Sequence, residues 1–171
     1  LNYPFVHMLA ASTLPQDPRI LTLDLREGGF PQLQQNIVVT GRDMLLSHGY
    51  LFLTRENPPS GAEVVTVSFE DPANLEIVDS VDIPYGGRRL AIEGDRLYSL
   101  STVGRIGVVD ISDPLELVSL SPTDYNGPVY GLLSQDGDDL AVHADHAFIT
   151  ASNVDTGELQ LVALDVASPG E

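Results

Sequence analysis

The amino-acid sequence predicts an all-β fold built from repeated units, and two patterns predict it. Short strand-like segments recur along the chain of 171 residues, with first residues Ile20, Val64, Ile106 and Leu161. Longer segments align without a gap, with first residues Met44, Leu90 and Leu140. Each longer segment is an apolar run, a two-residue turn and another apolar run, which is the pattern of a tight β-hairpin.

The spacing of the short segments identifies the kind of repeat. Their first residues are 44, 42 and 55 positions apart, and a period of about 40 to 45 residues with strand-like content is typical of propeller blades. Both faces of these strands are apolar, as in Val64 and Val65, and such strands are buried on both sides when sheets stack around an axis. The sequence therefore predicts a β-propeller-like array of four-stranded antiparallel blades, about three of them full.

The elements follow in order within a single domain that spans residues 1–171. Flanking strands are expected at residues 5–11 and 159–167. The three repeats between them span residues 19–61, 62–104 and 105–157. The third repeat is longer because it carries an insertion over Asn126–Asp138, rich in glycine and aspartate.

Three repeats do not close a ring, because propellers have about four to eight blades. We therefore expect the sequence to be part of a longer propeller. The alternative is a small complete domain, whose open edge strands would assemble with another copy or another chain.

The sequence at the end of each short strand-like segment, with the residues that follow it, resembles a motif of a known family. Val108–Pro114 reads V-V-D-I-S-D-P, and Val67–Pro72 matches it in part. Over residues 19–169 the chain resembles the LVIVD-type bacterial β-propellers. The motif is structural, so the resemblance carries over no catalytic residue, but it implies a bacterial protein that is secreted or exposed at the cell surface.

Composition excludes several classes of function. The net charge is −17, from 25 acidic residues against 8 arginines, and such a surface repels nucleic acid and anionic lipid. It can attract divalent cations or basic partners, but solubility or a salty habitat is the simpler explanation of the charge. There is no cysteine, and no apolar run is long enough for membrane insertion.

The irregular loops gather at one end of the predicted sheets, and the tight turns at the other. Function tends to lie on variable loops displayed by a rigid scaffold, so we expect a binding face at the loop end. At that end, Arg88 and Arg89 form a basic spot that could hold a carboxylate or sulfate of an acidic glycan. A local salt bridge to Asp82 or Glu93 is the alternative.

Aromatic and acidic residues provide two further candidate sites. Tyr85, Tyr125 and Tyr130 could line a ligand groove, or pack over the sheet ends. The carboxylates of Asp136, Asp138 and Asp139 could bind calcium. Their spacing is not that of an EF-hand, and a solvated turn explains them as well.

Two histidines, His143 and His146, flank the predicted turn at Ala144 and Asp145. Two imidazoles at that separation could share a transition metal, or form a cross-strand surface pair.

No catalytic motif is present: the sequence contains no Gly-x-Ser-x-Gly, phosphate-binding loop or His-Glu-x-x-His. We therefore expect a non-catalytic scaffold for protein or ligand interaction. The alternatives are a propeller enzyme acting on polysaccharide, and a calcium-dependent adhesion module.

Overall fold

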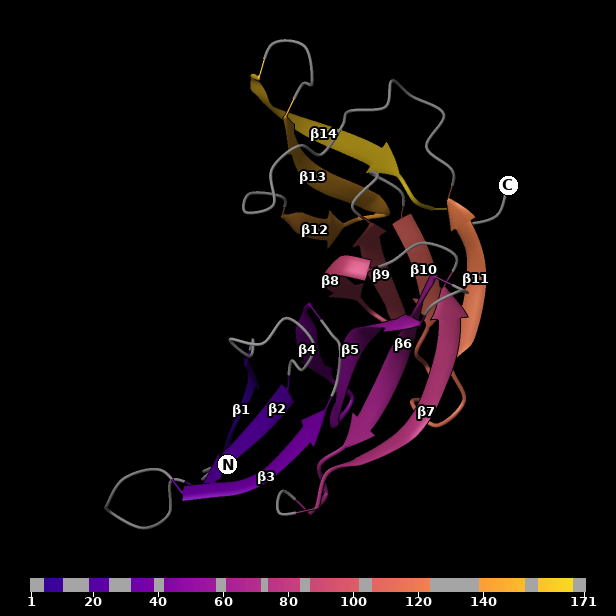
Figure 1. The fold of residues 1–171 in the computed structure, drawn as a ribbon. Coiled ribbons are helices and arrows are strands. Elements are labelled where there is room, and N and C mark those ends of the chain that lie inside the picture. Colours follow the sequence, from indigo (N-terminus) through magenta and orange to yellow (C-terminus); the bar gives the residue numbers. More distant parts are fainter. Residues whose placement is uncertain are drawn as a thin grey trace.

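The computed structural model describes residues 5–10, 19–24, 32–38, 42–57, 61–71, 74–83, 87–101, 106–123, 139–152 and 157–167. Side chains are described in residues 42–55, 62–71, 74–83, 87–101, 106–120, 139–150 and 157–167. Over these ranges the chain is all-β and contains no helix, so the all-β part of the predicted fold class is confirmed (Figure 1). No described segment is a helix with the length and apolar character needed to cross a membrane.

The described strands form four antiparallel sheets, numbered here in chain order. Sheet 1 contains β1 (Phe5–Ala10), β2 (Arg19–Asp24) and β3 (Gln32–Val38). Sheet 2 contains β4 (Met44–Ser47), β5 (Tyr50–Asn57), β6 (Gly61–Ser68) and β7 (Glu76–Ile83). Sheet 3 contains β8 (Gly87–Glu93), β9 (Arg96–Ser101), β10 (Ile106–Asp110) and β11 (Val118–Thr123). Sheet 4 contains β12 (Leu140–His143), β13 (His146–Ser152) and β14 (Leu159–Asp165).

The grouping of strands differs from the expectation of one sheet per repeat. Sheet 2 takes β4 and β5 from the end of repeat 19–61, and β6 and β7 come almost wholly from repeat 62–104. Sheets and sequence repeats are therefore out of phase by two strands. In a meander every strand runs antiparallel to the next, so the sequence period does not reveal which connection passes from one sheet to another.

The three predicted tight hairpins are confirmed at β4–β5, β8–β9 and β12–β13. In the first turn both central residues have positive φ, with His48 at 51° and Gly49 at 78°. In the third turn Ala144 and Asp145 have φ of 49° and 60°, although neither is a glycine. An alanine in this left-handed region is strained, because its Cβ approaches the following carbonyl oxygen.

Apolar side chains fill the space between successive sheets. Sheet 2 packs on sheet 3 through Phe52, Ala62, Val64 and Ile83 against Leu90, Leu97, Val109, Ile111 and Leu117. The opposite face of sheet 3 packs on sheet 4 through Tyr98, Leu100, Ile106 and Val108 against Leu140, Ala147, Ile149, Leu164 and Val166. Sheet 3 is thus buried on both faces, as its sequence predicts.

The sheets stack in one orientation, with corresponding strands adjacent. Strand β8 contacts β4 and β5 of sheet 2 on one side and β12 of sheet 4 on the other, and β11 contacts β7. Figure 1 shows the sheets following one another along an arc. The strands that begin sheets 2, 3 and 4 therefore lie next to one another.

One face of sheet 4 is exposed where the corresponding faces of sheets 2 and 3 are covered. Leu161 occupies the repeat position of Val64 and Ile106, which are 0% and 1% exposed, but is itself 71% exposed. Leu159, two residues earlier on the same strand face, is 73% exposed.

Carboxylates connect sheets 2 and 3. The Asp43 side chain accepts hydrogen bonds from the amides of Met44, at 2.9 Å, and of Leu90 in β8, at 2.8 Å. The Asp79 carboxylate in β7 accepts a bond of 2.6 Å from the Leu117 amide. The bonds to Leu90 and Leu117 each satisfy a backbone N–H of sheet 3, or of the loop preceding β11, with an acid from sheet 2 or the residue just before it.

The aspartate of the recurring motif shapes the end of its strand. Asp110 Oδ1 accepts from the Ser112 amide at 2.9 Å, and Asp165 Oδ1 accepts from the Ala167 amide at 3.0 Å. The residue that follows each aspartate, Ile111 or Val166, is buried. Its amide donates to a carbonyl of a hairpin turn at 2.8 Å, from Ile111 to Asp95 and from Val166 to Asp145. The motif thus anchors each strand end to the turn of the preceding hairpin.

Ala144→Gly should raise the free energy of unfolding by about 0.5–1 kcal/mol, because glycine accepts positive φ without the Cβ conflict. Chemical denaturation followed by circular dichroism measures this change. The control is Ala141→Gly in β12, where extended backbone gives glycine no advantage and stability should fall. A variant at position 144 no more stable than the wild type would contradict the strain argument.

Asp43→Ala should lower the free energy of unfolding by about 1–3 kcal/mol, because two backbone amides lose their acceptor. The matched control is Asp113→Ala. Asp113 accepts one bond of 2.9 Å from Leu115 within its own exposed loop, so a smaller loss is expected. Equal losses in the two variants would show that Asp43 does not connect the sheets energetically.

Asp110→Asn tests the strand-end hydrogen bond through its pH dependence. Hydrogen bonds from Ser112, chiefly from its amide, hold the pKa of Asp110 below its usual value of 3.8. A lowered folded-state pKa stabilises the fold above the unfolded pKa, and this contribution disappears as pH falls through the folded value. The wild type should exceed the variant in unfolding free energy near pH 7, and the two should converge as pH falls through the lowered folded-state pKa of Asp110. A constant difference across this range would refute the assignment.

Candidate functional site

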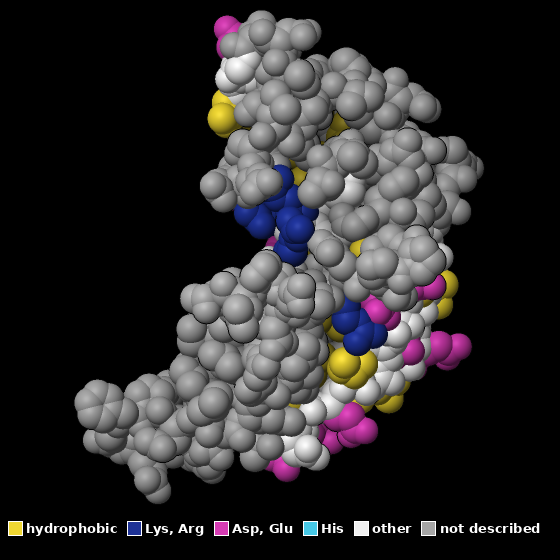
Figure 2. Space-filling view, in the orientation of Figure 1, with side chains coloured by type: hydrophobic (Ala, Val, Ile, Leu, Met, Phe, Trp, Pro, Cys, Tyr) yellow, Lys and Arg dark blue, Asp and Glu magenta, His cyan; other side chains and the backbone are white. Residues whose placement is uncertain are grey.

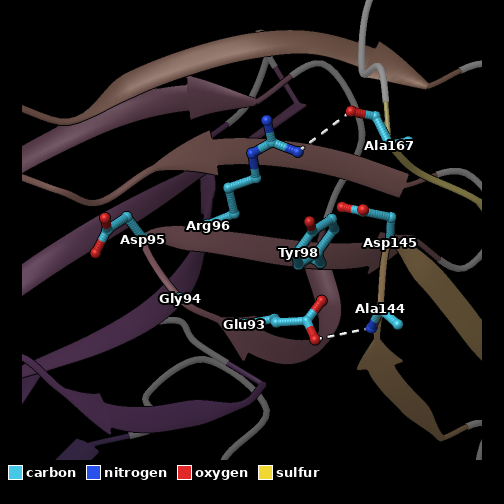
Figure 3. Close-up of a pocket in the computed structure, with 8 residues that line it drawn as sticks. All are labelled: Glu93, Gly94, Asp95, Arg96, Tyr98, Ala144, Asp145 and Ala167. Carbon is cyan, nitrogen blue, oxygen red and sulfur yellow. Dashed lines mark hydrogen bonds between the residues drawn. The ribbon is translucent and has the colours of Figure 1, made fainter.

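An open pocket of about 590 Å³ lies at the hairpin-turn ends of sheets 3 and 4 (Figure 3). Its walls come from the β8–β9 and β12–β13 turns and from the residues that follow β14. The lining residues are Glu93, Gly94, Asp95, Arg96, Tyr98, Ala144, Asp145 and Ala167.

The two hairpins place charged side chains around this pocket. Glu93 ends β8 and pairs in register with Arg96, which begins β9, so both side chains leave the sheet beside the Gly94–Asp95 turn. Asp145 occupies the corresponding turn of the next hairpin. Because β8 and β12 contact one another, the two turns face the same opening.

Hydrogen bonds between the sheets fix the pocket walls. Glu93 Oε1 accepts from the Ala144 amide at 2.8 Å, and Arg96 Nη1 donates to the Ala167 carbonyl at 3.4 Å. Figure 3 shows these two bonds bridging sheets 3 and 4. The Asp95 carboxylate lies 3.2 Å from Nε2 of His48, which belongs to the β4–β5 turn of sheet 2. Three sheets therefore contribute to the shape of the site.

The pocket has an excess of negative charge. Three carboxylates line it, those of Glu93, Asp95 and Asp145, against one cation, Arg96. The Arg96 guanidinium donates to the Ala167 carbonyl, and its charge contributes to lowering the pKa of Asp110. The Arg96 guanidinium is thus held against the wall of the pocket.

Tyr98 is the most buried side chain of the lining, with 1% of its surface exposed. The described residues form no hydrogen bond with its hydroxyl group, although its ring packs in the core between sheets 3 and 4. In Figure 3 the hydroxyl of Tyr98 and the carboxylate of Asp145 point toward one another across the pocket.

The structure places the predicted basic spot on the strand that begins sheet 3. Arg88 is buried, 5% exposed, and Arg89 is half-buried with its Nη1 donating to the Arg88 carbonyl at 3.3 Å. Asp139 lies just before β12, where it accepts a bond of 3.0 Å from the Leu140 amide. Arg88, Arg89 and Asp139 are therefore brought to the same end of adjacent strands, β8 and β12. Figure 2 shows two separate groups of basic side chains, one of them at a concave notch, with acidic side chains along the outer margin.

Five of the predicted site residues lie outside the described residues: Tyr85, Tyr125, Tyr130, Asp136 and Asp138. The tyrosine groove and the calcium site therefore stay predictions.

The two histidines at the β12–β13 turn engage different partners. His143 Nδ1 lies 3.5 Å from Glu93 Oε1, while His146 Nδ1 lies 2.8 Å from the Ala144 carbonyl oxygen and its ring stacks near Phe148. Over the ranges with described side chains, no group of three or more histidine, aspartate or glutamate residues is arranged to hold a metal ion.

Sequence reasoning directed attention to the loop end and missed the pocket at the turn end. The available signal was the acids in two aligned hairpins, Glu93, Asp95 and Asp145. It became meaningful only once the sheets were stacked.

No protein-family model matches the chain, and no curated protein matches it.

Proposed function

We propose that this protein is a non-catalytic β-propeller scaffold for protein interaction. The observation that carries the proposal is the adjacency of β4, β8 and β12, the first strands of three successive sheets. Blades arranged around an axis bring their first strands together in this way. The repeat period supports the same arrangement.

The use of charged groups favours a scaffold over an enzyme. Asp43, Asp79 and Glu93 each accept a backbone hydrogen bond from the next sheet or the loop that packs with it, so these acids hold the stack together. A rigid stack of this kind displays loops and turns at its two ends, where partners can dock. With a net charge of −17, the partners it favours are basic proteins.

The proposal extends to location and family. The V-V-D-I-S-D-P motif supports a place among the LVIVD-type bacterial propellers, and that family together with the acidic composition supports secretion or cell-surface exposure. The structural role of Asp110 and Ile111 at the strand end is consistent with a motif that defines architecture.

The test is a peptide array probed with the folded chain at about 0.15 M ionic strength, where long-range charge attraction is screened. We expect saturable binding to a subset of basic peptides that is lost when the chain is unfolded in urea. In parallel, a panel of polysaccharides is assayed for newly released reducing ends, and no release is expected. Sugar release by the purified chain, or binding only to calcium-loaded surfaces, would replace the scaffold by one of the alternative functions.

A further inference from the structure

We propose that the pocket between the hairpin turns of sheets 3 and 4 recognises a guanidinium group, such as an arginine side chain of a partner protein. This inference deepens the scaffold proposal and relies on it only for the source of the arginine. The evidence consists of the charge of the lining, the unpaired hydroxyl that Tyr98 directs into the pocket and the fixed geometry of the walls.

The charge of the lining selects a cation. Glu93, Asp95 and Asp145 contribute three carboxylates, and the single cation, Arg96, is held by the Ala167 carbonyl at 3.4 Å. Only one oxygen of Glu93 accepts the Ala144 amide, so its other oxygen remains available for a ligand. No described residue hydrogen-bonds to the carboxylate of Asp145, which is exposed at the turn.

The hydroxyl of Tyr98 is an independent indication of a polar ligand. The side chain is 1% exposed, yet its hydroxyl has no hydrogen-bond partner among the described residues. Where side chains are described, the buried polar atoms without a partner are Thr66 Oγ1 and Ser99 Oγ, so the Tyr98 hydroxyl opens onto the pocket, where a ligand can reach it. An N–H of a ligand placed between Tyr98 and Asp145 would satisfy it.

The arrangement fits a guanidinium better than a metal ion. The acids surround an opening of about 590 Å³, and no metal-binding group of three or more is present where side chains are described. A guanidinium is planar and carries five N–H donors in a fixed fork, so it can contact Glu93, Asp145 and Tyr98 at once.

The test titrates the full chain of 171 residues with N-acetyl-arginine amide and follows backbone amide shifts by NMR. The matched probe is N-acetyl-citrulline amide, which has nearly the same shape and no charge. We expect saturable shifts at Gly94, Tyr98 and Asp145 with the arginine probe and none with the citrulline probe. Equal shifts with both probes would overturn the proposal.

Variants assign the binding to the pocket. Asp145→Asn and Tyr98→Phe should each weaken binding of the arginine probe by roughly three- to tenfold, the size expected for the net contribution of one typical hydrogen bond in water. The control is Glu76→Gln, which removes an exposed carboxylate of β7 that does not line the pocket. If all three variants weaken binding equally, the attraction is a general effect of the acidic surface, and the proposal fails.

The two proposals can fail separately. Arginine binding without any peptide partner on the array would leave the pocket assignment intact and remove the scaffold function. If peptides bind and Asp145→Asn does not change their binding, the scaffold function would stand and the assignment of arginine recognition to the pocket would fail.

Discussion

The structure depends on one constraint, which is that its strands carry apolar side chains on both faces. Val64 and Val65 of β6 are both fully buried, on opposite sides of sheet 2, and the same holds for Val108 and Val109 of β10. A sheet of this kind is stable in water only when another sheet covers each face. Stacking therefore follows from composition, and the turns, strand-end motifs and pocket follow from stacking.

Several of the acidic residues form ion pairs or accept backbone hydrogen bonds within the fold. Glu63 is buried in sheet 2, where its carboxylate lies 2.6 Å from Nε of Arg55. Other acids accept backbone amides at the junctions between sheets, as Asp43 and Asp79 do. Gly87 allows β8 to approach β5, because a Cβ at that position would collide with the side chains of Thr54 and Ser99. Close packing and polar bridges thus act at the same junction.

The sequence predicted the features that depend on near neighbours. The hairpin at Gly94–Asp95 and the two-faced strand at Val64–Ser68 are local patterns, and both are present. The limits of the sheets could not be predicted, because backbone pairing alternates identically at every turn of a meander. The burial of Arg88 and the pocket around Tyr98 depend on which side chains the neighbouring sheet supplies, and a single repeat contains no information about that.

The phase difference between repeats and sheets has a consequence for how such a chain can change in length. A sheet of this kind contains strands of two successive sequence repeats, and in sheet 2 the boundary between the repeats falls between β5 and β6. A duplicated or deleted segment of one full period preserves the alternation of strands wherever the cut falls, since the four strand types return in the same cyclic order. Growth of the gene by tandem duplication therefore needs no particular breakpoint, and the protein can gain or lose a whole sheet without disturbing the pairing of those that remain.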